Sequence, residues 1–411
     1  MDLTAGSLVE HAFRHEYGRL VAGLVRRLGT ARLALAEDAV QTALVRAMQT
    51  WPHRGVPNEP AAWLRRAAYH AAVDALRTEA RVDRLGDHEP TAIPDLPDDS
   101  PVADEPLRLL FLCCHPALPI ESRVALSLKL VCGFGVGEIA RGLLVSEAAI
   151  LKRLTRAKDA LAAIGPSADP LSLPDLAERR DAVMAVLYLL FNEGYHSSQP
   201  NQLIRRDICS EAIRQTDVLA RHPELGSPAA EALLALMLLH AARFPGREDD
   251  TGRLVLLDAQ DRSRWDWPMI MEGLSWLTRA ARGEELSAYH VEAAIAAEHA
   301  RATTYAATDW ARIIDLYDLL DQHQPHWLHA LNRAVAIGCL HGPQAGLRSL
   351  LAVEASDAHG YSHWHAALGE LHRRCGHEAE ARKHFDQAHK LAANDSERTF
   401  LSEKLADLDR E

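Results

Sequence analysis

The chain has 411 residues, of which 48% are apolar and 25% are charged, and it carries a formal net charge of −12 at pH 7. This length and composition predict a soluble globular protein of two to four domains. A membrane-spanning class is excluded, because no apolar run reaches the roughly 18 residues that cross a bilayer. The N-terminus has no charged-then-apolar signal peptide, so we expect a cytoplasmic protein. The six cysteines show no CxxC spacing, which predicts buried thiols and not a disulfide framework.

The charges are unevenly distributed along the chain. Residues 1–84 contain 12 basic and 9 acidic residues, and residues 85–105 contain 7 acidic residues and no basic one. Residues 106–164 contain 8 basic and 4 acidic residues. Residues 165–411 contain 25 basic and 37 acidic residues. Two modestly basic segments are thus joined to an acidic linker and an acidic tail, which predicts weak intrinsic affinity for DNA.

Residues 7–28 are predicted to form an amphipathic helix that ends at Gly29. Two further helices follow between residues 36 and 81, separated by a turn-rich break at residues 51–59. We expect the first helix to pack against this pair. Its apolar stripe comprises Phe13, Tyr17, Leu20, Leu24 and Leu28.

The helix after Pro60 has two contrasting faces. The apolar face recurs at helical spacing through Leu64, Ala67, Ala68, Ala71, Ala75 and Leu76 and is expected to be packed. The opposite face, named here the basic edge, comprises Arg66, His70, Asp74, Arg77 and Arg81. Trp63 and Tyr69 flank this edge, where aromatic rings beside cations can stack on unpaired bases. The pattern favours nucleic-acid binding, although a solvated surface helix has the same pattern.

Residues 36–47 and the following Trp51-Pro52 resemble the polymerase-docking helix of the extracytoplasmic-function (ECF) group of sigma-70-class sigma factors. The pattern Trp63-Leu64, Ala68, Asp74 and Arg77 resembles the promoter minus-10 helix of the same family. This resemblance implies that the basic edge, Trp63 and Tyr69 face promoter DNA. It also implies that the clamp helices of the polymerase β′ subunit contact Asp38, Gln41 and Arg46.

The break at residues 51–59 is, by the same resemblance, the loop that captures a flipped base, and a plain connector fits it equally well. Residues 85–105 contain four prolines and no basic residue, so they are predicted to be a linker. In the family the equivalent segment threads through the polymerase near the RNA exit path. A plain tether explains this composition equally well.

Residues 106–163 are predicted to form four helices. The last two, at 136–143 and 146–161, are joined by a very short turn, which is the spacing of a helix-turn-helix. Ser146 is suited to cap the second of these helices. The inward-facing positions are Ile150, Leu154, Ala157 and Leu161, and the outward-facing cations are Lys152, Arg153, Arg156 and Lys158.

The run from Ser146 to Lys158 resembles the minus-35 recognition helix of ECF sigma factors, and Glu138-Ile139-Ala140 matches the helix before it. The resemblance implies that Ser146, Glu147 and the four cations contact promoter DNA. It further implies that this domain binds the β flap of core RNA polymerase.

The tail is predicted to be helical throughout, with helices at 176–191, 204–221, 228–244, 268–281 and 288–301. Residues 187–195, 260–265 and 293–297 resemble blocks of ECF factors that carry a long C-terminal extension with tetratricopeptide (TPR) repeats. In that subgroup the extension replaces or supplements a separate anti-sigma factor. A protein or small-molecule regulator acting on the tail is therefore a possible partner.

An internal repeat lies near the C-terminus. Two sets with identical internal spacing, 35 residues apart, are Ala334, Gly346, Leu350, Val353 and Gly369, Ala381, Phe385, Ala388. Their period and order of small and large residues fit a TPR helix pair. Residues 309–320 are a candidate degenerate third unit, and residues 395–408 a candidate capping helix.

Three features of the chain invite a metal or ligand site. Asp98, Asp99 and Asp104 lie in the linker, Asp315, Asp318 and Asp321 are spaced along a helix edge, and His359, His363 and His365 surround Trp364. Solvated side chains explain all three sets, and we expect no metal, no cofactor and no catalytic residue. The turn at residues 192–197 fits a helix cap better than a ligand pocket.

The sequence thus predicts an all-α protein of five segments. They are a region-2 domain at 1–84, a linker at 85–105, a region-4 helix-turn-helix domain at 106–164, a helical extension at 165–285 and TPR-like helical repeats at 286–411. The predicted function is that of a sigma factor, not an enzyme. A TPR adaptor with a helix-turn-helix and an all-helical metal-dependent enzyme remain the alternatives.

Overall fold

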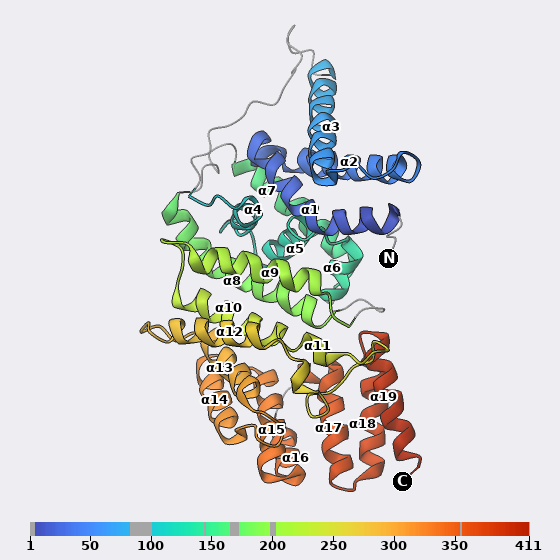
Figure 1. Cartoon of the computed structure of the whole chain (residues 1–411), viewed down its shortest axis with the longest axis vertical. Coiled ribbons are helices and arrows are strands. Elements are labelled where there is room, and N and C mark those ends of the chain that lie inside the picture. The colour runs from blue at the N-terminus through green and yellow to red at the C-terminus, as the bar shows by residue number, and fades with distance from the viewer. Residues whose placement is uncertain are drawn as a thin grey trace. The chain divides into compact units, whose positions relative to one another are not determined.

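The computed structural model describes residues 5–82, 101–143, 145–164, 172–197, 203–353 and 356–410. Regular structure in these ranges is helical (Figure 1), and the one isolated β-bridge among them joins Glu248 and Leu254. The predicted all-α fold is confirmed. Within the described ranges, no helix combines the length and apolar content needed to cross a membrane.

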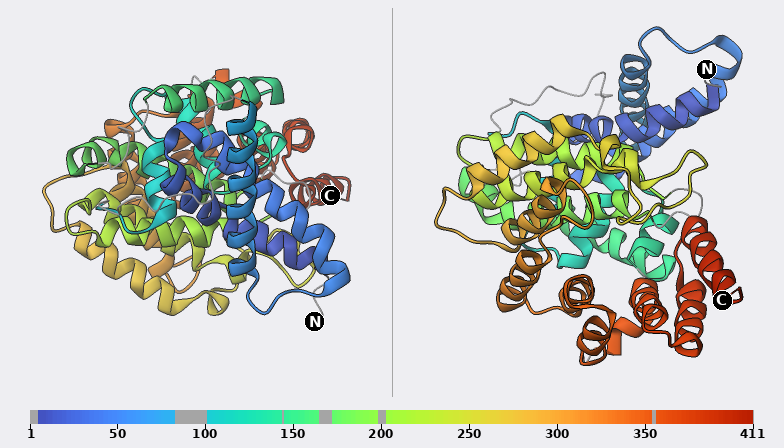
Figure 2. Two further views of the ribbon diagram at one scale, coloured as in Figure 1. Left: turned by 90° about the horizontal axis from the view of Figure 1, so that it is seen from above. Right: turned by 60° about the horizontal axis from the view of Figure 1, so that its bottom comes forward.

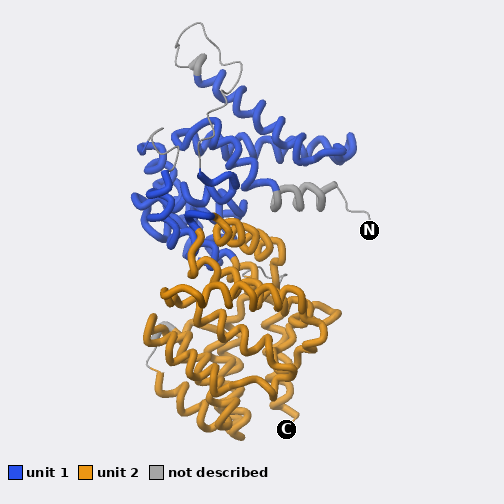
Figure 3. Tube along the Cα trace, turned by 60° about the vertical axis from the view of Figure 1, so that its left-hand side comes forward, with its two compact units in different colours: residues 1–190, 223–225 blue, residues 191–222, 226–411 orange. Residues whose placement is uncertain are grey.

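The chain divides into two compact units, coloured separately in Figure 3. Unit 1 comprises residues 1–190 and 223–225, and unit 2 comprises residues 191–222 and 226–411. Unit 1 extends beyond the predicted end of the helix-turn-helix domain at residue 164. The reason lies in the helix that follows, in which buried Arg179 donates a hydrogen bond to the Phe111 carbonyl oxygen at 3.3 Å.

Unit 1 contains the three N-terminal helices and the four helices predicted for residues 106–163. The second helix runs past Trp51 to Arg54 and ends at Gly55, whose φ of 81° few other residues adopt. The first part of α8 also belongs to this unit. The elements are α1 Ala5–Leu28, the short η1 Thr30–Arg32, α2 Leu33–Arg54, α3 Pro60–Val82, α4 Glu105–Cys113, α5 Ile120–Leu130, α6 Val136–Gly142, α7 Glu147–Ile164 and α8 Leu173–Tyr195.

Helix α1 packs against both halves of unit 1. It contacts α2 and α3 on one side and α4 and α5 on the other. Gly18 is required for the second contact, because an added Cβ would lie 2.2 Å from the Val131 carbonyl oxygen. The described buried residues of α1 include Tyr17, Leu20, Val21, Leu24 and Val25.

Unit 2 is built around α10, which is apolar on all sides and almost entirely buried, as expected of a helix surrounded by others. The predicted helix at 228–244 is divided into two helices, α10 and α11. Pro245 is tolerated only in the first turn of a helix, so α10 ends at Ala241 and α11 begins at Phe244, just before the proline. The elements are α9 Arg206–Arg221, α10 Pro228–Ala241, α11 Phe244–Arg247, α12 Trp267–Ala280, α13 Ala288–Arg301, α14 Trp310–His323, α15 Trp327–His341, α16 Pro343–Leu351, α17 Ser362–Arg374, α18 Glu378–Leu391 and α19 Asp395–Leu408.

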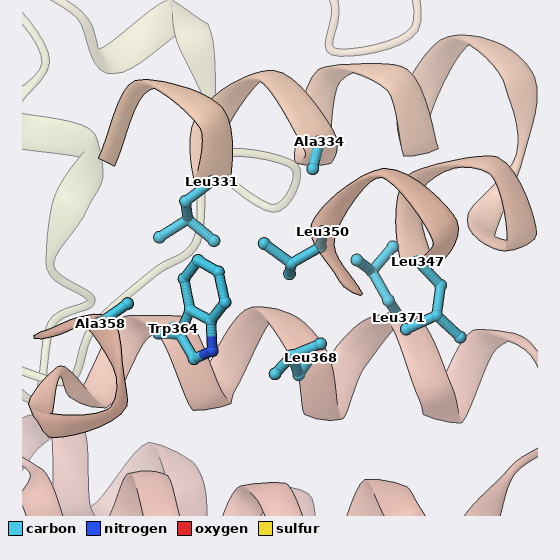
Figure 4. Packing of buried hydrophobic residues seen from close by; sticks show 8 residues of the cluster. All are labelled: Leu331, Ala334, Leu347, Leu350, Ala358, Trp364, Leu368 and Leu371. Atoms are coloured by element: carbon cyan, nitrogen blue, oxygen red, sulfur yellow. The ribbon is translucent and has the colours of Figure 1, made fainter. Parts of the chain in front are cut away.

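The C-terminal helices pack as neighbouring pairs, with α15 beside α16 and α17 beside α18 (Figures 1 and 2). Within the first pair, an added Cβ on Gly346 would lie 2.8 Å from the Gly338 Cα atom, and within the second, one on Gly369 would lie 2.7 Å from the Phe385 ring. Figure 4 shows the shared core, in which Trp364 of α17 lies beside Leu331 of α15 and near Leu350 of α16. Small residues of the predicted repeat thus lie where the two helices of each pair come close. The assignment as TPR repeats stays a prediction.

The Gly346→Ala substitution is expected to destabilise unit 2. The new methyl group would meet backbone atoms of α15, which cannot move aside as a side chain can, and overpacking of this kind costs about 1–3 kcal/mol. Thermal unfolding followed by circular dichroism measures the effect. Gly360→Ala is the matched control, because no atom lies within 4 Å of its added Cβ. Equal stability of the two variants would contradict the close approach of α15 and α16.

Two histidines of unit 2 are held neutral in the folded state. Burial, with Arg243 and Arg247 nearby, lowers the pKa of His240 to about 3. Burial, with Arg243 and Arg262 nearby, likewise lowers the pKa of His299 to about 3. In the unfolded chain both rings regain the ordinary value of 6.5.

We expect unit 2 to lose stability as the pH falls from 6.5 towards 3. In that window the unfolded chain binds more protons than the folded one, so the stabilisation is complete above pH 6.5 and decreases on the order of 1 kcal/mol per histidine per pH unit. Calorimetry at pH 7.5 and 5.5 measures the loss. The His240→Gln, His299→Gln double variant should lose less over the same interval, and an identical loss would show that other groups cause it.

Candidate nucleic-acid interface

The basic edge of α3 lies on the surface of unit 1. Arg66, His70 and Asp74 are exposed, and the Arg77 side chain is 36% exposed and pairs with Asp74 at 3.5 Å. The opposite face is packed as predicted, with Leu64, Ala68 and Ala71 buried together with Ala72 and Val73. Arg81 belongs to α3, but its side chain lies outside the described part of the structure.

The two aromatic rings beside the edge are held by protein contacts. The Trp63 ring meets buried Trp51 edge-on at 5.6 Å, and the Arg27 guanidinium lies 5.7 Å from the centre of the Tyr69 ring. Both aromatic side chains are half-buried. Their orientation is therefore largely set before any ligand binds, which lowers the entropic cost of stacking on a base.

A basic groove of about 330 Å³ lies between α1 and α3, beside the edge. Its single acidic lining residue, Glu105, pairs with Arg26 at 3.3 Å. The sequence analysis did not predict that α1 contributes basic side chains to this groove. The consecutive arginines Arg26 and Arg27 could have indicated it. The charged and aromatic lining residues are Arg19, Arg26, Arg27, Arg65, Arg66, Tyr69 and Glu105.

The helix-turn-helix is formed by α6 and α7. The Ala149 amide donates to the Ser146 hydroxyl at 3.2 Å, so Ser146 caps α7 as predicted. The predicted inward positions Ile150, Leu154, Ala157 and Leu161 are buried. Glu147, Lys152 and Arg156 are exposed and Arg153 is half-buried, so these four side chains form an accessible face.

Lys158 does not share that face. Its ammonium group pairs with the carboxylate of Glu37 on α2, and its side chain is 23% exposed. Glu37 is 2% exposed and accepts further contacts from Lys129, Tyr17 and Gln41. A role of Lys158 in binding DNA stays a prediction, and it requires this contact to open.

The exposed face of α2 combines polar and apolar groups. Asp38, Gln41 and Arg46 are exposed, as expected of residues that meet a partner. Val45 and Met48 follow Gln41 at steps of four and three and are 51% and 61% exposed. The sequence analysis did not single out these two side chains. Their apolar character at positions outside the packed face of α2 could have indicated a contact surface. We name Asp38, Gln41, Val45, Arg46 and Met48 the docking face.

Some side chains of the three sets that were weighed as metal sites have other partners, and others lie outside the described residues. Asp104 caps α4 by accepting from the Leu107 amide, and Asp318 pairs with Arg333 at 2.6 Å. Asp98 and Asp99 lie outside the described residues. Within the described part of the chain, no group of three or more His, Cys, Asp or Glu side chains is arranged to hold a metal ion.

The turn at 192–197 includes the C-terminal end of α8. Other residues of unit 2 donate hydrogen bonds to its carbonyl groups. The Arg205 amide donates to the Gly194 carbonyl at 2.7 Å, and the Arg247 guanidinium donates to the Tyr195 carbonyl at 2.8 Å. The Asn394 side chain contacts the Ser197 carbonyl at 3.5 Å. The carbonyl groups at the end of α8 are thereby satisfied, in line with the helix-cap interpretation.

Three family models match the chain. Residues 13–82 match sigma-70 region 2, residues 108–161 match sigma-70 region 4, and residues 179–281 match a family of unknown function, DUF6596. An uncharacterized protein of Rhizobium meliloti (strain 1021) is 40% identical over 382 residues, which cover 91% of this chain and 90% of that relative.

Replacing both Lys152 and Arg156 by Gln is expected to weaken binding to duplex DNA. Each cation that neutralises a phosphate contributes about 0.9 to the slope of log K against log salt, so the slope should shrink by nearly 2. Fluorescence anisotropy of the full chain with a short duplex, starting at about 50 mM salt, measures it.

The matched control replaces Lys383 and Lys390 of α18 by Gln, which removes the same charge from exposed positions far along the chain. Its salt slope should equal that of the unmodified chain. A slope that shrinks equally in both variants would mean that net charge, and not the α7 face, controls binding.

Proposed function

Because the chain belongs to the sigma-70 class of sigma factors, as an ECF-like member with a C-terminal helical extension, we propose that it recruits core RNA polymerase through α2 and recognises promoters through α3 and α7. The observation that carries this proposal is that α7 has one buried apolar face and one accessible cationic face. Four buried residues anchor one face, while Lys152, Arg153 and Arg156 with Ser146 and Glu147 form the other. A recognition helix has this division.

The proposed mechanism is binding and involves no covalent step. Arg66, Arg77 and the α7 cations contact phosphates and supply most of the affinity, while groups that reach base edges supply sequence preference. His70 on the basic edge, with Trp63 and Tyr69 beside it, is proposed to stack on bases of the opened minus-10 strand. The α1 arginines extend the basic surface along which the strand backbone runs.

The docking face of α2 is the proposed contact for the β′ clamp helices. Exposed Val45 and Met48 offer apolar area for burial, and Asp38, Gln41 and Arg46 offer directional polar contacts around them. Interfaces commonly have such an apolar centre with a polar rim. The β flap is the proposed partner of the region-4 domain.

Unit 2 is the proposed regulatory part. It is compact in its own right, and near its C-terminus two sets of four positions recur 35 residues apart, a period that suits a TPR-like binding scaffold. A groove of about 560 Å³ along α18 is lined by basic Arg382, Lys383 and Lys390 in an otherwise acidic tail. This groove is the proposed contact for an acidic regulator.

Promoter-dependent transcription tests the proposed function. Core polymerase with the intact chain should produce transcripts with defined start sites from a pool of genomic fragments, and core polymerase alone should not. Arg153→Ala should weaken promoter binding several-fold while polymerase association, measured by co-elution, stays unchanged, because α7 is distinct from the docking face. Equal loss of both would contradict the assignment of α7 to DNA, and the absence of any defined transcript would favour an adaptor role.

The regulatory role of unit 2 is assessed in the same assay with Gly346→Ala. This variant loosens α15 and α16 without changing any residue of unit 1. A several-fold change in transcript yield in either direction supports regulation by the tail, and an unchanged yield contradicts it.

A further inference from the structure

The basic groove along α18, named here the α18 groove, is lined by a row of histidines as well as by cations. His384 of α18 stacks on two rings of α17, with ring centres 5.4 Å from His365 and 5.5 Å from His372. His384 and His365 both line the groove, together with exposed His359. The protonation state of His384 therefore affects which charges the groove accepts.

The hydrogen bonds of this row fix the protons on His384. The Nε2 atom of His365 lies 3.1 Å from the His359 carbonyl oxygen, and because that oxygen can only accept, Nε2 carries the proton. In the neutral His365 ring Nδ1 then accepts, so the Nδ1 atom of His384, 3.1 Å away, donates to it. The Nε2 atom of His384 is thus left as the nitrogen that can take up a further proton.

His384 is neutral in the folded protein. The pKa of its ring is lowered to about 4, mainly by burial. His365, His372 and Lys383 contribute to the lowering, and the carboxylate of Glu380 acts in the opposite sense. An anion in the groove favours the charged form of the ring, so its binding raises the pKa of His384. Anion binding and proton uptake are therefore coupled.

The permanent charges of the groove also favour an anion. Arg382, Lys383 and Lys390 line it, against the single carboxylate of Asp386. Arg382 pairs with Asp409 after α19 at 2.5 Å. Among the described residues, neither lysine pairs with a carboxylate, so both ammonium groups are available to a ligand. The groove volume of about 560 Å³ suits a small molecule.

We propose that the α18 groove binds a small molecule that carries a phosphate monoester, and that this dianionic group contacts Lys383, Lys390 and a protonated His384. A monoester has a charge of about −1.5 to −2 and three acceptor oxygens, which match two ammonium groups and one imidazolium. A phosphodiester, as in a nucleic-acid backbone, carries one charge and gains less from the proton on His384.

This inference rests on the proposed function in one respect, which is that it takes the phosphorylated molecule to be the acidic regulator of unit 2. The binding itself needs neither polymerase nor promoter DNA. Binding and transcription can therefore be measured separately.

Equilibrium dialysis of the full chain against radiolabelled inorganic phosphate, at pH 7.5 and about 0.15 M salt, measures binding. The Lys383→Gln, Lys390→Gln variant should hold one phosphate fewer per chain than the unmodified protein, because the groove should bind phosphate at least tenfold more weakly. Phosphate bound elsewhere on the chain is common to both proteins and cancels in the difference. An excess of dimethyl phosphate, a diester, should displace much less of the groove's phosphate than unlabelled phosphate does.

The matched control is Arg312→Gln, Arg348→Gln, which removes the same charge from exposed positions on α14 and α16. It should bind as much phosphate as the unmodified chain. Circular dichroism checks that every variant keeps its helices. Equal binding by the lysine variant and the unmodified chain, or an equal loss in the control, overturns the site. An acidic peptide that binds through the two lysines where phosphate does not would overturn it in favour of a protein regulator.

The role of His384 is tested with inorganic sulfate, which stays dianionic between pH 6.0 and 7.5. If bound sulfate restores the pKa of His384 to the ordinary 6.5, the affinity of the groove rises roughly fourfold from pH 7.5 to 6.0. His384→Gln should abolish this rise. His389→Gln, on α18 but outside the groove lining, should keep it.

A rise that persists unchanged in His384→Gln overturns the coupling of binding to this histidine. If promoter-dependent transcripts form but the groove binds no phosphate, this inference fails and the proposed function stands. If no transcript forms, the proposed function fails, and the dialysis measurements alone decide what the groove binds.

Discussion

A carboxylate that is 2% exposed must be paired, and this requirement organises unit 1. Among the described residues, Glu37 pairs with the ammonium groups of Lys129 and Lys158, and both lysines belong to the helix-turn-helix half of the unit. Moving either half away leaves the charge without a partner unless water or another protein replaces it. Glu37 therefore ties α2 to α5 and α7 within unit 1.

The charge distribution along the chain bears on DNA binding. Two modestly basic halves are attached to a tail of 25 basic and 37 acidic residues, so the full chain has little long-range attraction for DNA. With Lys158 paired internally, the α7 face is weaker still.

Close approaches at small residues and an apolar central helix help to hold unit 2 together. Gly346 meets the backbone of α15, Gly369 meets the Phe385 ring, and α10 is surrounded by apolar neighbours. Its buried histidines are neutral because burial and nearby arginines disfavour their charged forms. Close packing and uncharged buried histidines thus characterise the part of the protein whose proposed role is regulation.

Local sequence patterns were enough to predict the helical class, the packed faces of α3 and α7 and the Ser146 cap, because each depends on residues within a few turns of one another. The positions of Asp38, Gln41 and Arg46 at a partner surface were implied by the resemblance to ECF sigma factors, and all three are exposed. Periodicity shows which side of a helix is polar, but not which other helix that side meets. The pairing of Lys158 with Glu37 spans 121 residues, and only the tertiary structure could place one cation of α7 in a junction and leave its neighbours exposed. The groove formed by arginines of α1 and α3, and the approach of Gly18 to Val131, were likewise decided by packing between distant segments.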